Sequence, residues 1–294
     1  MGKLKSNILL LAAMVAAMYS CKKGEVVSDP EANGSGSYVT LVSSQGNTIN
    51  YANLAGSKVG ITVKEYGEPI EKIVLYVTKG ASANLNRTAW KKIKEVPYSG
   101  ETKLEVTAAE IATALGVTPA DLSPGTSYII YNQCVTKAGA IHDAANTNSG
   151  YQGLPAYNMV LTWSTSVICP FAPPAAGTYI VVADQWADWS VGDEVQVTDG
   201  PGANQVNLSK VWPNPIYGTV INPLYITVNP ATGAATSPSG LAWGDYSAFG
   251  FTTVNGTGST GFVFSCIGTI DVSIRFSAPP FGDQGLQKLT LRKK

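Results

Sequence analysis

The sequence predicts an all-β protein in which two antiparallel β-domains follow one another: an immunoglobulin-like sandwich, then a second β-sandwich or partly closed barrel. Three observations predict this class. Short runs of alternating apolar and polar residues recur along the chain, turn residues separate them, and no long amphipathic helix interrupts them. Apolar residues make up 45% of the chain, which is enough for packed cores. The roughly 255 residues after residue 37 suit two domains better than one.

The first domain is predicted to cover residues 38–166. Val59, Ile61 and Val63 alternate with small or polar residues, and the runs IEKIVLYVTKG, YIIYNQCV and NMVLTW continue the strand pattern. One short helix is expected where Thr107 begins T-A-A-E, because this is a capping box in which Glu110 reaches back to the start of the helix.

The second domain is predicted to cover residues 167–294. It follows the proline-rich stretch ICPFAPPAAGTY and alternates more regularly than the first. Ile270, Val272 and Ile274 lie opposite polar neighbours, and LQKLTLRKK is expected to be the last strand. The sequence does not decide whether this domain is a sandwich or a barrel.

Residues 1–20 have the layout of a bacterial lipoprotein signal peptide. Lys3 and Lys5 form a basic head, residues 8–17 form an apolar centre, and Ser20 precedes Cys21. The apolar run is too short to cross about 30 Å of hydrocarbon. We therefore expect cleavage before Cys21 and lipidation of this cysteine. An ordinary secretory signal followed by an incidental cysteine is the alternative.

Residues 21–37 are polar and rich in glycine and serine, which is typical of a flexible tether. No later apolar run is long enough to span a membrane, so membrane association is expected to depend on Cys21 alone. The chain has 20 basic and 20 acidic residues. Because the charges balance, there is no electrostatic sign of nucleic-acid binding.

Three cysteines remain after Cys21, and an exported protein meets an oxidising compartment. One disulfide and one free thiol are the simplest arrangement. We expect Cys169 to pair with Cys266 because both lie in the predicted second domain. In the chain-entropy model this bridge would stabilise the fold by roughly 4–5 kcal/mol. Cys134 is then expected to be a buried free thiol and not a nucleophile.

Two motifs that suggest chemistry have simpler explanations. The segment GTGSTG satisfies G-x-G-x-x-G, but strand-like runs flank it on both sides, so we expect a hairpin turn and not a dinucleotide site. His142 is the only histidine, and it lies in the polar stretch AGAIHDAANTNSG, where we expect a surface loop. A single histidine with dispersed cysteines falls short of the usual zinc site.

The most acidic stretch is ADQWADWSVGDEVQVTDG, residues 183–200. Oxygen ligands on a loop can bind calcium, but the spacing does not match an EF-hand and carboxylates on loops are usually only solvated. The sequence leaves calcium binding at residues 184–199 open.

Aromatic residues in turn-like contexts of the second half are the candidate ligand platform. Such rings either bind the apolar faces of sugars, with polar neighbours nearby, or cap the ends of the β-core. Trp186 and Trp189 are expected to be the most exposed. The candidate residues are Trp186, Trp189, Trp212, Tyr217, Trp243 and Tyr246.

The segment LSPGTSY, residues 122–128, resembles the L-x-P-G-x-x-Y segment of fibronectin type III and related immunoglobulin-like domains. The resemblance implies that Tyr128 begins strand F and forms a tyrosine corner, with its hydroxyl bonded to upstream backbone. Cys134 would then share a sheet face with Tyr128 and Ile130.

The combined layout resembles surface lipoproteins of polysaccharide-utilisation loci, of the SusE/SusF type. The likeness depends on Cys21, the tether, LSPGTSY, the C-P-x(6)-G-T-Y segment from Cys169 to Tyr179 and the terminal TLRKK. It implies an outer-membrane protein, anchored by lipid and facing the cell surface, that holds oligo- or polysaccharide near importer proteins without cleaving it. The periplasmic face is the alternative location.

We therefore expect a non-enzymatic accessory protein that binds carbohydrate and needs no cofactor or metal. A structural or adhesive surface module that contacts protein partners is the alternative. An enzyme is not expected, because no nucleophile motif is present and no pair of carboxylates stands out for glycoside hydrolysis.

Overall fold

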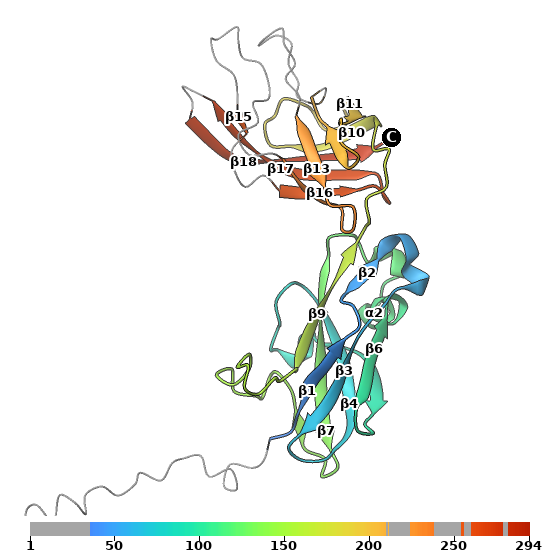
Figure 1. Ribbon diagram of the computed structural model, residues 1–294, viewed down its shortest axis with the longest axis vertical. Coiled ribbons are helices and arrows are strands. Elements are labelled where there is room, and N and C mark those ends of the chain that lie inside the picture. The colour runs from blue at the N-terminus through green and yellow to red at the C-terminus, as the bar shows by residue number, and fades with distance from the viewer. Residues whose placement is uncertain (1–35, 210, 212–223, 238–253, 256–259, 279–281) are drawn as a thin grey trace, which may run out of the picture.

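The computed structural model describes residues 36–209, 211, 224–237, 254–255, 260–278 and 282–294 (Figure 1). Strands dominate, and the predicted all-β class is confirmed. Strands β1 to β9 form one unit, the sandwich domain, and strands β10 to β18 form a second, the barrel domain. Figure 1 shows the two domains end to end, with the chain passing from β9 into β10 between them.

The sandwich domain has two sheets. The smaller sheet has the order β1-β3-β6, and the larger has the order β2-β9-β7-β4-β5, with β8 paired to β7. Neighbours are antiparallel except β2 and β9, which are parallel. The strands are β1 (Tyr38–Ser44), β2 (Thr48–Asn50), β3 (Lys58–Tyr66), β4 (Ile70–Lys79), β5 (Lys91–Pro97), β6 (Thr102–Thr107), β7 (Ser127–Thr136), β8 (Ile141–His142) and β9 (Thr162–Ile168).

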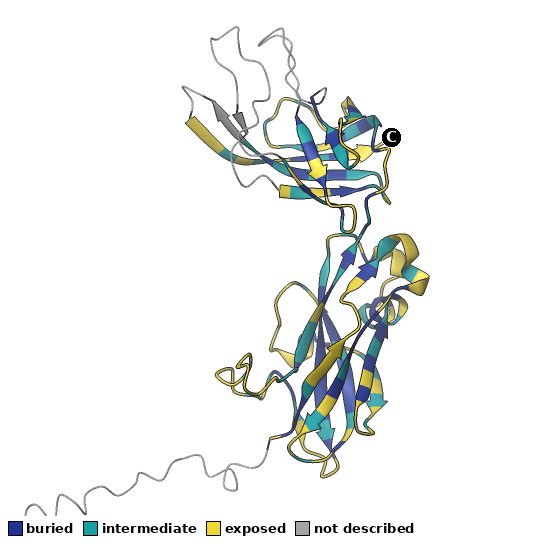
Figure 2. Cartoon of the chain, viewed as in Figure 1, coloured by how far each residue is buried: buried dark blue, intermediate teal, exposed yellow. Residues whose placement is uncertain are grey.

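Strand β7 is buried on both faces, which explains its almost continuous apolar sequence. Tyr128, Ile130 and Cys134 face the core between the two sheets, as expected from their spacing. Ile129 and Tyr131 lie on the opposite face in a smaller cluster, where Tyr131 stacks on Trp90 with ring centroids 4.2 Å apart. Figure 2 shows this strand as mostly buried. Period-two alternation thus supplies two cores from a single strand.

Helix α2 (Ala108–Leu115) forms as predicted. The Thr107 side chain accepts a hydrogen bond from the Glu110 backbone N–H, and the Glu110 carboxylate accepts one from the Thr107 N–H, so the capping box is complete. Gly116 ends the helix with φ of 73°, a left-handed conformation that glycine adopts without strain. Short 3₁₀ turns lie at η1 (Tyr51–Gly56), η2 (Arg87–Ala89) and η3 (Pro119–Asp121).

Tyr128 lies at the start of its strand, as the tyrosine-corner resemblance implies, but its hydroxyl does not make the expected hydrogen bond within the described residues. Tyr128 is the second residue of β7 and is 2% exposed. Burial raises the pKa of its hydroxyl. Within the described residues, however, no hydrogen bond links this hydroxyl to upstream backbone. The ring therefore acts as part of the sandwich core.

The barrel domain is a closed eight-stranded barrel, which decides between the two predicted forms. Its strand order is β17-β16-β14-β13-β12-β11-β10-β18, and β18 pairs back to β17. A ninth strand, β15, pairs with the other edge of β17. The strands are β10 (Gly177–Asp184), β11 (Glu194–Asp199), β12 (Gln205–Asn207), β13 (Tyr225–Val228), β14 (Ala234–Thr236), β15 (Val254–Asn255), β16 (Thr260–Phe264), β17 (Thr269–Ala278) and β18 (Gly282–Lys293).

Inward-facing side chains fill the barrel. Val181, Val195, Ile226, Val272 and Leu291 are each at most 2% exposed and belong to one apolar cluster. An eight-stranded barrel has an interior about wide enough for side chains to fill. The interior is therefore a packed core, in agreement with the alternation in the sequence.

The glycine-rich segment GTGSTG does not form the predicted hairpin. β15 and β16, which flank it, do not pair with each other: both run antiparallel to β17 along the edge that β18 does not occupy, with Val254 opposite Ser277 and Thr260 opposite Ser273. The chain therefore has the same direction along β17 before and after residues 256–259, which lie outside the described residues. The prediction was wrong because local alternation does not show which strand becomes the partner.

A disulfide joins Cys169 to Cys266, as expected, with the two Cα atoms 6.0 Å apart. Cys169 directly follows β9, and Cys266 lies in the turn between β16 and β17. Ser265 strengthens the same junction, because its hydroxyl accepts a hydrogen bond from the Ala172 N–H at 2.9 Å. The segment between β9 and β10 is thus fixed to the barrel domain directly after β9 ends. In the part of the chain described, no helix is long and apolar enough to cross a membrane.

Candidate functional site

The two predicted platform residues that the structure describes, Trp186 and Trp189, are half-buried and pack against the barrel core. The indole N–H of Trp189 donates a hydrogen bond to the Val211 carbonyl. For this pair the structure favours the capping role over the ligand platform. Both rings were expected to be exposed, and both are instead half-buried. Trp212, Tyr217, Trp243 and Tyr246 lie outside the described residues.

Two carboxylates of the acidic stretch, Asp184 and Asp193, bond to their own loop, whereas Asp199 accepts from the Ala175 and Ala176 N–H groups and Glu194 pairs with Lys294. Asp184 accepts hydrogen bonds from the backbone N–H groups of Trp186, Asp188 and Trp189 at 2.9, 3.1 and 3.0 Å. Asp193 accepts one from Ser190 at 2.8 Å. Burial and the nearby charge of Asp184 raise the pKa of Asp188 to about 6. Among the described residues, no group of three or more acidic, histidine or cysteine side chains is placed to hold a metal ion.

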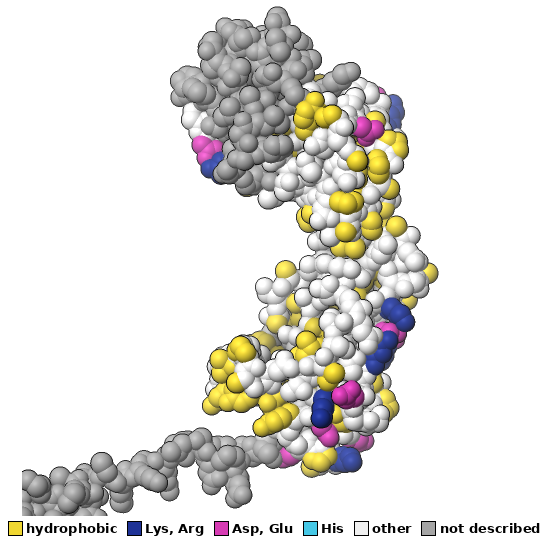
Figure 3. Space-filling model, viewed as in Figure 1, with side chains coloured by type: hydrophobic (Ala, Val, Ile, Leu, Met, Phe, Trp, Pro, Cys, Tyr) yellow, Lys and Arg dark blue, Asp and Glu magenta, His cyan; other side chains and the backbone are white. Residues whose placement is uncertain are grey.

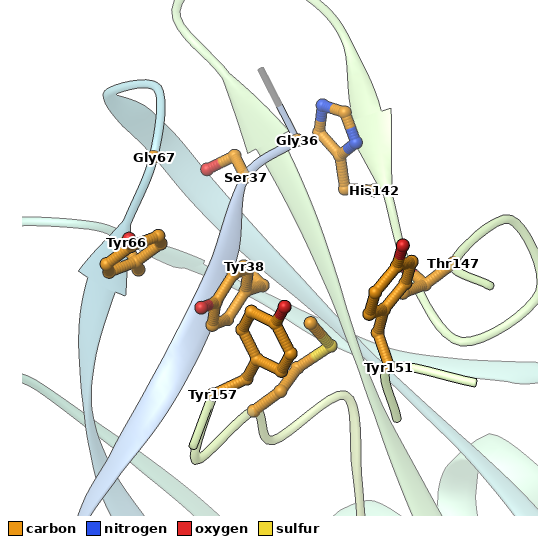
Figure 4. Close-up of a pocket in the computed structure, with 10 residues that line it drawn as sticks. Gly36, Ser37, Tyr38, Tyr66, Gly67, His142, Thr147, Tyr151 and Tyr157 are labelled. Atoms are coloured by element: carbon orange, nitrogen blue, oxygen red, sulfur yellow. The ribbon is translucent and has the colours of Figure 1, made fainter. Parts of the chain in front are cut away.

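A well-formed cavity lined by described residues lies instead in the sandwich domain. It has a volume of about 460 Å³ and lies between the ends of β1 and β3, strand β8 and the segment 143–159 (Figure 4). This volume is within the range of small-ligand pockets. The lining residues, which we call the tyrosine pocket, are Gly36, Ser37, Tyr38, Tyr66, Gly67, His142, Thr147, Tyr151, Tyr157 and Met159.

Two pairs of tyrosines form the walls of the tyrosine pocket. Tyr38 and Tyr66 are cross-strand partners on β1 and β3, so their rings lie on one sheet face with centroids 5.0 Å apart. Tyr151 and Tyr157 come from the segment 143–159 and meet edge to face at 5.6 Å. Tyr66 is 62% exposed and Tyr151 is 50% exposed, so the pocket presents large aromatic surfaces to solvent.

The Tyr38 hydroxyl stays neutral. Tyr38 is the most buried of the four, and burial, followed by repulsion from Tyr66 and Tyr157, raises the pKa of its hydroxyl. A neutral phenol both donates and accepts a hydrogen bond. The pocket therefore combines apolar ring faces with uncharged polar groups.

Asp143 fixes the start of the segment that carries Tyr151 and Tyr157. Its side chain is fully buried, and it accepts hydrogen bonds from both Arg87 Nε and Nη2, at 2.9 and 2.8 Å. Gln133 Nε2 and the Ala145 N–H donate two more, at 2.7 and 2.9 Å. Burial by itself raises the pKa of Asp143, but these donors outweigh it and hold the pKa below its ordinary value.

Other side-chain amides hold the rest of the segment. Gln152 Nε2 donates to the carbonyls of Ala144 and Thr147, at 3.1 and 2.7 Å. Asn158 Nδ2 donates to the Leu41 carbonyl at 2.9 Å, which ties the end of the segment to β1. A stretch with almost no regular secondary structure is thus ordered by specific side-chain bonds, as is common for binding loops on a rigid scaffold.

His142 corrects the surface-loop prediction. It lies in the short strand β8, is half-buried and lines the tyrosine pocket. The register makes it the cross-strand partner of Cys134. That thiol is not activated, because burial, with a smaller effect of the Asp143 charge, raises its pKa to about 12. Cys134 is the buried free thiol expected from the sequence.

The sequence held a weak signal for this pocket. The stretch SGYQGLPAY places Tyr151 and Tyr157 in a turn-rich segment, which is the same context that pointed to the second-half aromatics. Tyr38 and Tyr66 sit at strand ends, where an aromatic residue is ordinary. Only the pairing of β1 with β3 and the return of the segment 143–159 to β1 bring the four rings together.

Comparison with known proteins finds no family model, no curated protein and no solved structure that matches the chain.

Proposed function

We propose that this protein is a lipid-anchored, non-enzymatic accessory protein that binds carbohydrate near an outer-membrane glycan importer. The observation that carries the proposal is the tyrosine pocket, which now replaces the second-domain aromatics as the first candidate site. Sugars have apolar faces bordered by hydroxyls, and phenol rings match both features at once. Because Tyr66 and Tyr151 are already exposed and the loop is already tied down, binding would cost little reorganisation.

Anchoring through Cys21 would keep this site close to the membrane. Gly36, which lines the pocket, lies fifteen positions after Cys21 in the sequence. A flexible chain of that length has an end-to-end distance of roughly 20 Å. The pocket would therefore be held within reach of membrane proteins that import the bound glycan. Incorporation of labelled palmitate into the wild-type protein but not into Cys21→Ser tests the anchor.

A protein-contacting adhesive module remains the second candidate, and one observation favours it. Exposed apolar side chains occur on β8 and on the segment 143–159, where Ile141 is 46% exposed and Leu154 is 45% exposed. Figure 3 shows hydrophobic side chains on the protruding segment of the sandwich domain. Exposed apolar patches also mark protein interfaces.

Affinity electrophoresis in gels that contain polysaccharides separates the two. We expect at least one polysaccharide to slow the wild-type protein, and we expect Tyr66→Ala and Tyr151→Ala to remove at least 80% of that retardation. Both side chains are exposed, so these variants are expected to fold. Leu85→Ala, a 51% exposed apolar residue outside the pocket, is the control and should behave as wild type. Unchanged mobility in every polysaccharide would reject the carbohydrate proposal.

A further inference from the structure

The tyrosine pocket is lined by aromatic rings, small hydroxyls, a methionine, two glycines and one imidazole. None of its ten lining residues is Asp, Glu, Lys or Arg. Its polar atoms are phenol, serine and threonine hydroxyls and the His142 imidazole nitrogens, together with backbone groups. Proteins that bind ionised sugars need a cation to replace the water lost by the anion, because an unpaired charge is costly in an apolar site.

The cation nearest to the pocket's loop is already occupied. Arg87 uses two of its nitrogens on the buried Asp143 carboxylate, and its charge is neutralised there. Lys64 is two residues from Tyr66 on the same strand, so it lies on the same sheet face, but it is not part of the lining. It is the one cation of β3 that a ligand bound to Tyr66 could approach.

Acidic residues border the lining at several points in the chain. Glu65 and Glu68 flank Tyr66 and Gly67, and Asp143 follows His142. The Glu65 carboxylate accepts a hydrogen bond from the Ile70 N–H at 3.0 Å, so it keeps its place beside the turn. Asp143 is paired with Arg87, and Glu65 alternates with Tyr66 along β3 and so points to the opposite sheet face. Glu68 is the remaining acidic neighbour, and its charge would disfavour an anionic ligand more than a neutral one.

The small hydroxyls of the pocket are oriented by bonds to backbone carbonyls. Ser37 Oγ donates to the Glu68 carbonyl at 2.8 Å, and Thr147 Oγ1 donates to the Asp143 carbonyl at 2.8 Å. With their protons used in this way, both oxygens present lone pairs, which accept hydrogen bonds from ligand hydroxyls. A hydroxyl of a neutral sugar supplies that donor, and a carboxylate or sulfate does not.

We propose that the tyrosine pocket selects neutral glycans and discriminates against uronic-acid and sulfated ones. This inference depends on the proposed carbohydrate-binding function and deepens it, because it names the ligand class. The discrimination comes from the absence of Lys and Arg in the lining, from the neighbouring Glu68 carboxylate and from hydroxyls oriented as acceptors.

Polysaccharides of matched backbone and different charge test the inference with the intact protein. Suitable pairs are hydroxyethyl cellulose with carboxymethyl cellulose, dextran with dextran sulfate, and fully methyl-esterified with de-esterified polygalacturonan. Affinity electrophoresis and calorimetry are run on each pair at 50 mM and 500 mM salt. For any pair that binds, we expect the neutral member to bind at least tenfold more tightly, with less than a twofold change between the two salt concentrations.

The outcomes separate the two levels of the proposal. Equal or tighter binding of an anionic member would overturn the neutral assignment and leave carbohydrate binding intact. Failure of every polysaccharide to bind would overturn the proposed function. Lys64→Ala is the further variant: unchanged affinities support the inference. A tenfold loss for an anionic member would instead identify Lys64 as its contact and count against the inference.

Discussion

At the scale of single residues, Asp143 connects the core of the sandwich domain to the pocket. It is fully buried next to the apolar cluster around Trp90 and Tyr131, and its four donors come from η2, from β7 and from its own loop. A buried carboxylate is tolerated only when such donors replace its lost hydration. The Asp143 carboxylate therefore orders the loop, and hydrogen bonds from Arg87 and Gln133 offset the free-energy cost of burying its charge.

The stability of the protein is expected to depend on pH through this residue. Because the fold lowers the pKa of Asp143, the unfolded chain binds more protons between the folded pKa and the ordinary value of 3.8. The stabilisation is present above about pH 5 and is lost as the pH falls through the folded pKa. We expect Asp143→Asn to be less stable than wild type by about 2 kcal/mol at pH 7.

Urea denaturation between pH 3 and pH 8 measures the difference in unfolding free energy between wild type and Asp143→Asn, which we call the gap. It should be constant above about pH 5 and should shrink below pH 4, where the wild-type carboxylate becomes protonated. Glu101→Gln is the control, since Glu101 is an exposed carboxylate in the turn before β6. A gap that keeps its full size at pH 3 would show that the Asp143 charge does not stabilise the fold.

At the scale of elements, the segment 143–159 is the part of the sandwich domain that makes the site. It returns to β1, where the Val160 N–H donates to the Val39 carbonyl at 2.8 Å and Thr40 bridges to Met159. Both its ends are therefore fixed to sheet elements, and its middle is held mainly by Gln152. Order in such a loop lowers the entropic cost of binding.

Gln152→Ala is expected to weaken ligand binding more than it weakens the fold. The change removes two hydrogen bonds inside the loop, so hydrogen exchange should accelerate in residues 144–157 and affinity for a bound polysaccharide should fall about threefold to tenfold. Thr107→Ala is the matched control. It removes the α2 cap, which costs about 1 kcal/mol of stability, far from the pocket.

The contrast between the two variants is the informative result. Thr107→Ala should lower the unfolding midpoint and leave polysaccharide affinity unchanged. Gln152→Ala should lower polysaccharide affinity and change the unfolding midpoint less. If loop exchange rises in Gln152→Ala but affinity stays at the wild-type value, order in this segment is not needed for binding.

At the scale of the whole molecule, the junction between the domains is fixed to the barrel rather than left as a free linker. Cys169, Pro170 and Ala172 all contact the β16–β17 turn, through the disulfide to Cys266 and through Ser265. At the same place Phe264 approaches Gly125 of the sandwich domain closely: a Cβ on Gly125 would lie 3.0 Å from its ring. The two domains therefore meet through a small, defined contact.

Reduction of the disulfide is expected to destabilise the barrel domain and spare the sandwich domain. The bridge closes a loop across 97 positions of the chain, which corresponds to roughly 4–5 kcal/mol in the chain-entropy model. Thermal unfolding followed by hydrogen exchange should show protection lost first in β10 to β18 when a reductant is present. Cys134→Ala controls for the free thiol. Equal loss in both domains would contradict this division.

Much of the fold could be predicted because its signals are local. The α2 capping box lies within four residues, and the alternation in β7 and β17 follows from the two-residue period of a strand. Which strands become partners is not a local signal. The hairpin expected at GTGSTG did not form, because β15 and β16 pair with successive stretches of one edge of β17 and not with each other.

The site was predicted less well for the same reason. Trp186 and Trp189 occur in turn-like sequence, yet tertiary packing places both against the barrel core, while Tyr66 and Tyr151 remain open to solvent. The sequence distinguishes a ring on a turn from a ring in a strand. It does not show whether that turn folds over a core or away from it.

The sequence by itself determined the all-β class, the α2 helix, the buried Cys134 and the pairing of Cys169 with Cys266. Only the tertiary structure decided that the second domain closes as a barrel and that four tyrosines from separate segments share one pocket. The physical reason is range. Propensity, capping and alternation act over a few residues, whereas barrel closure and the pocket depend on strand register between residues tens of positions apart.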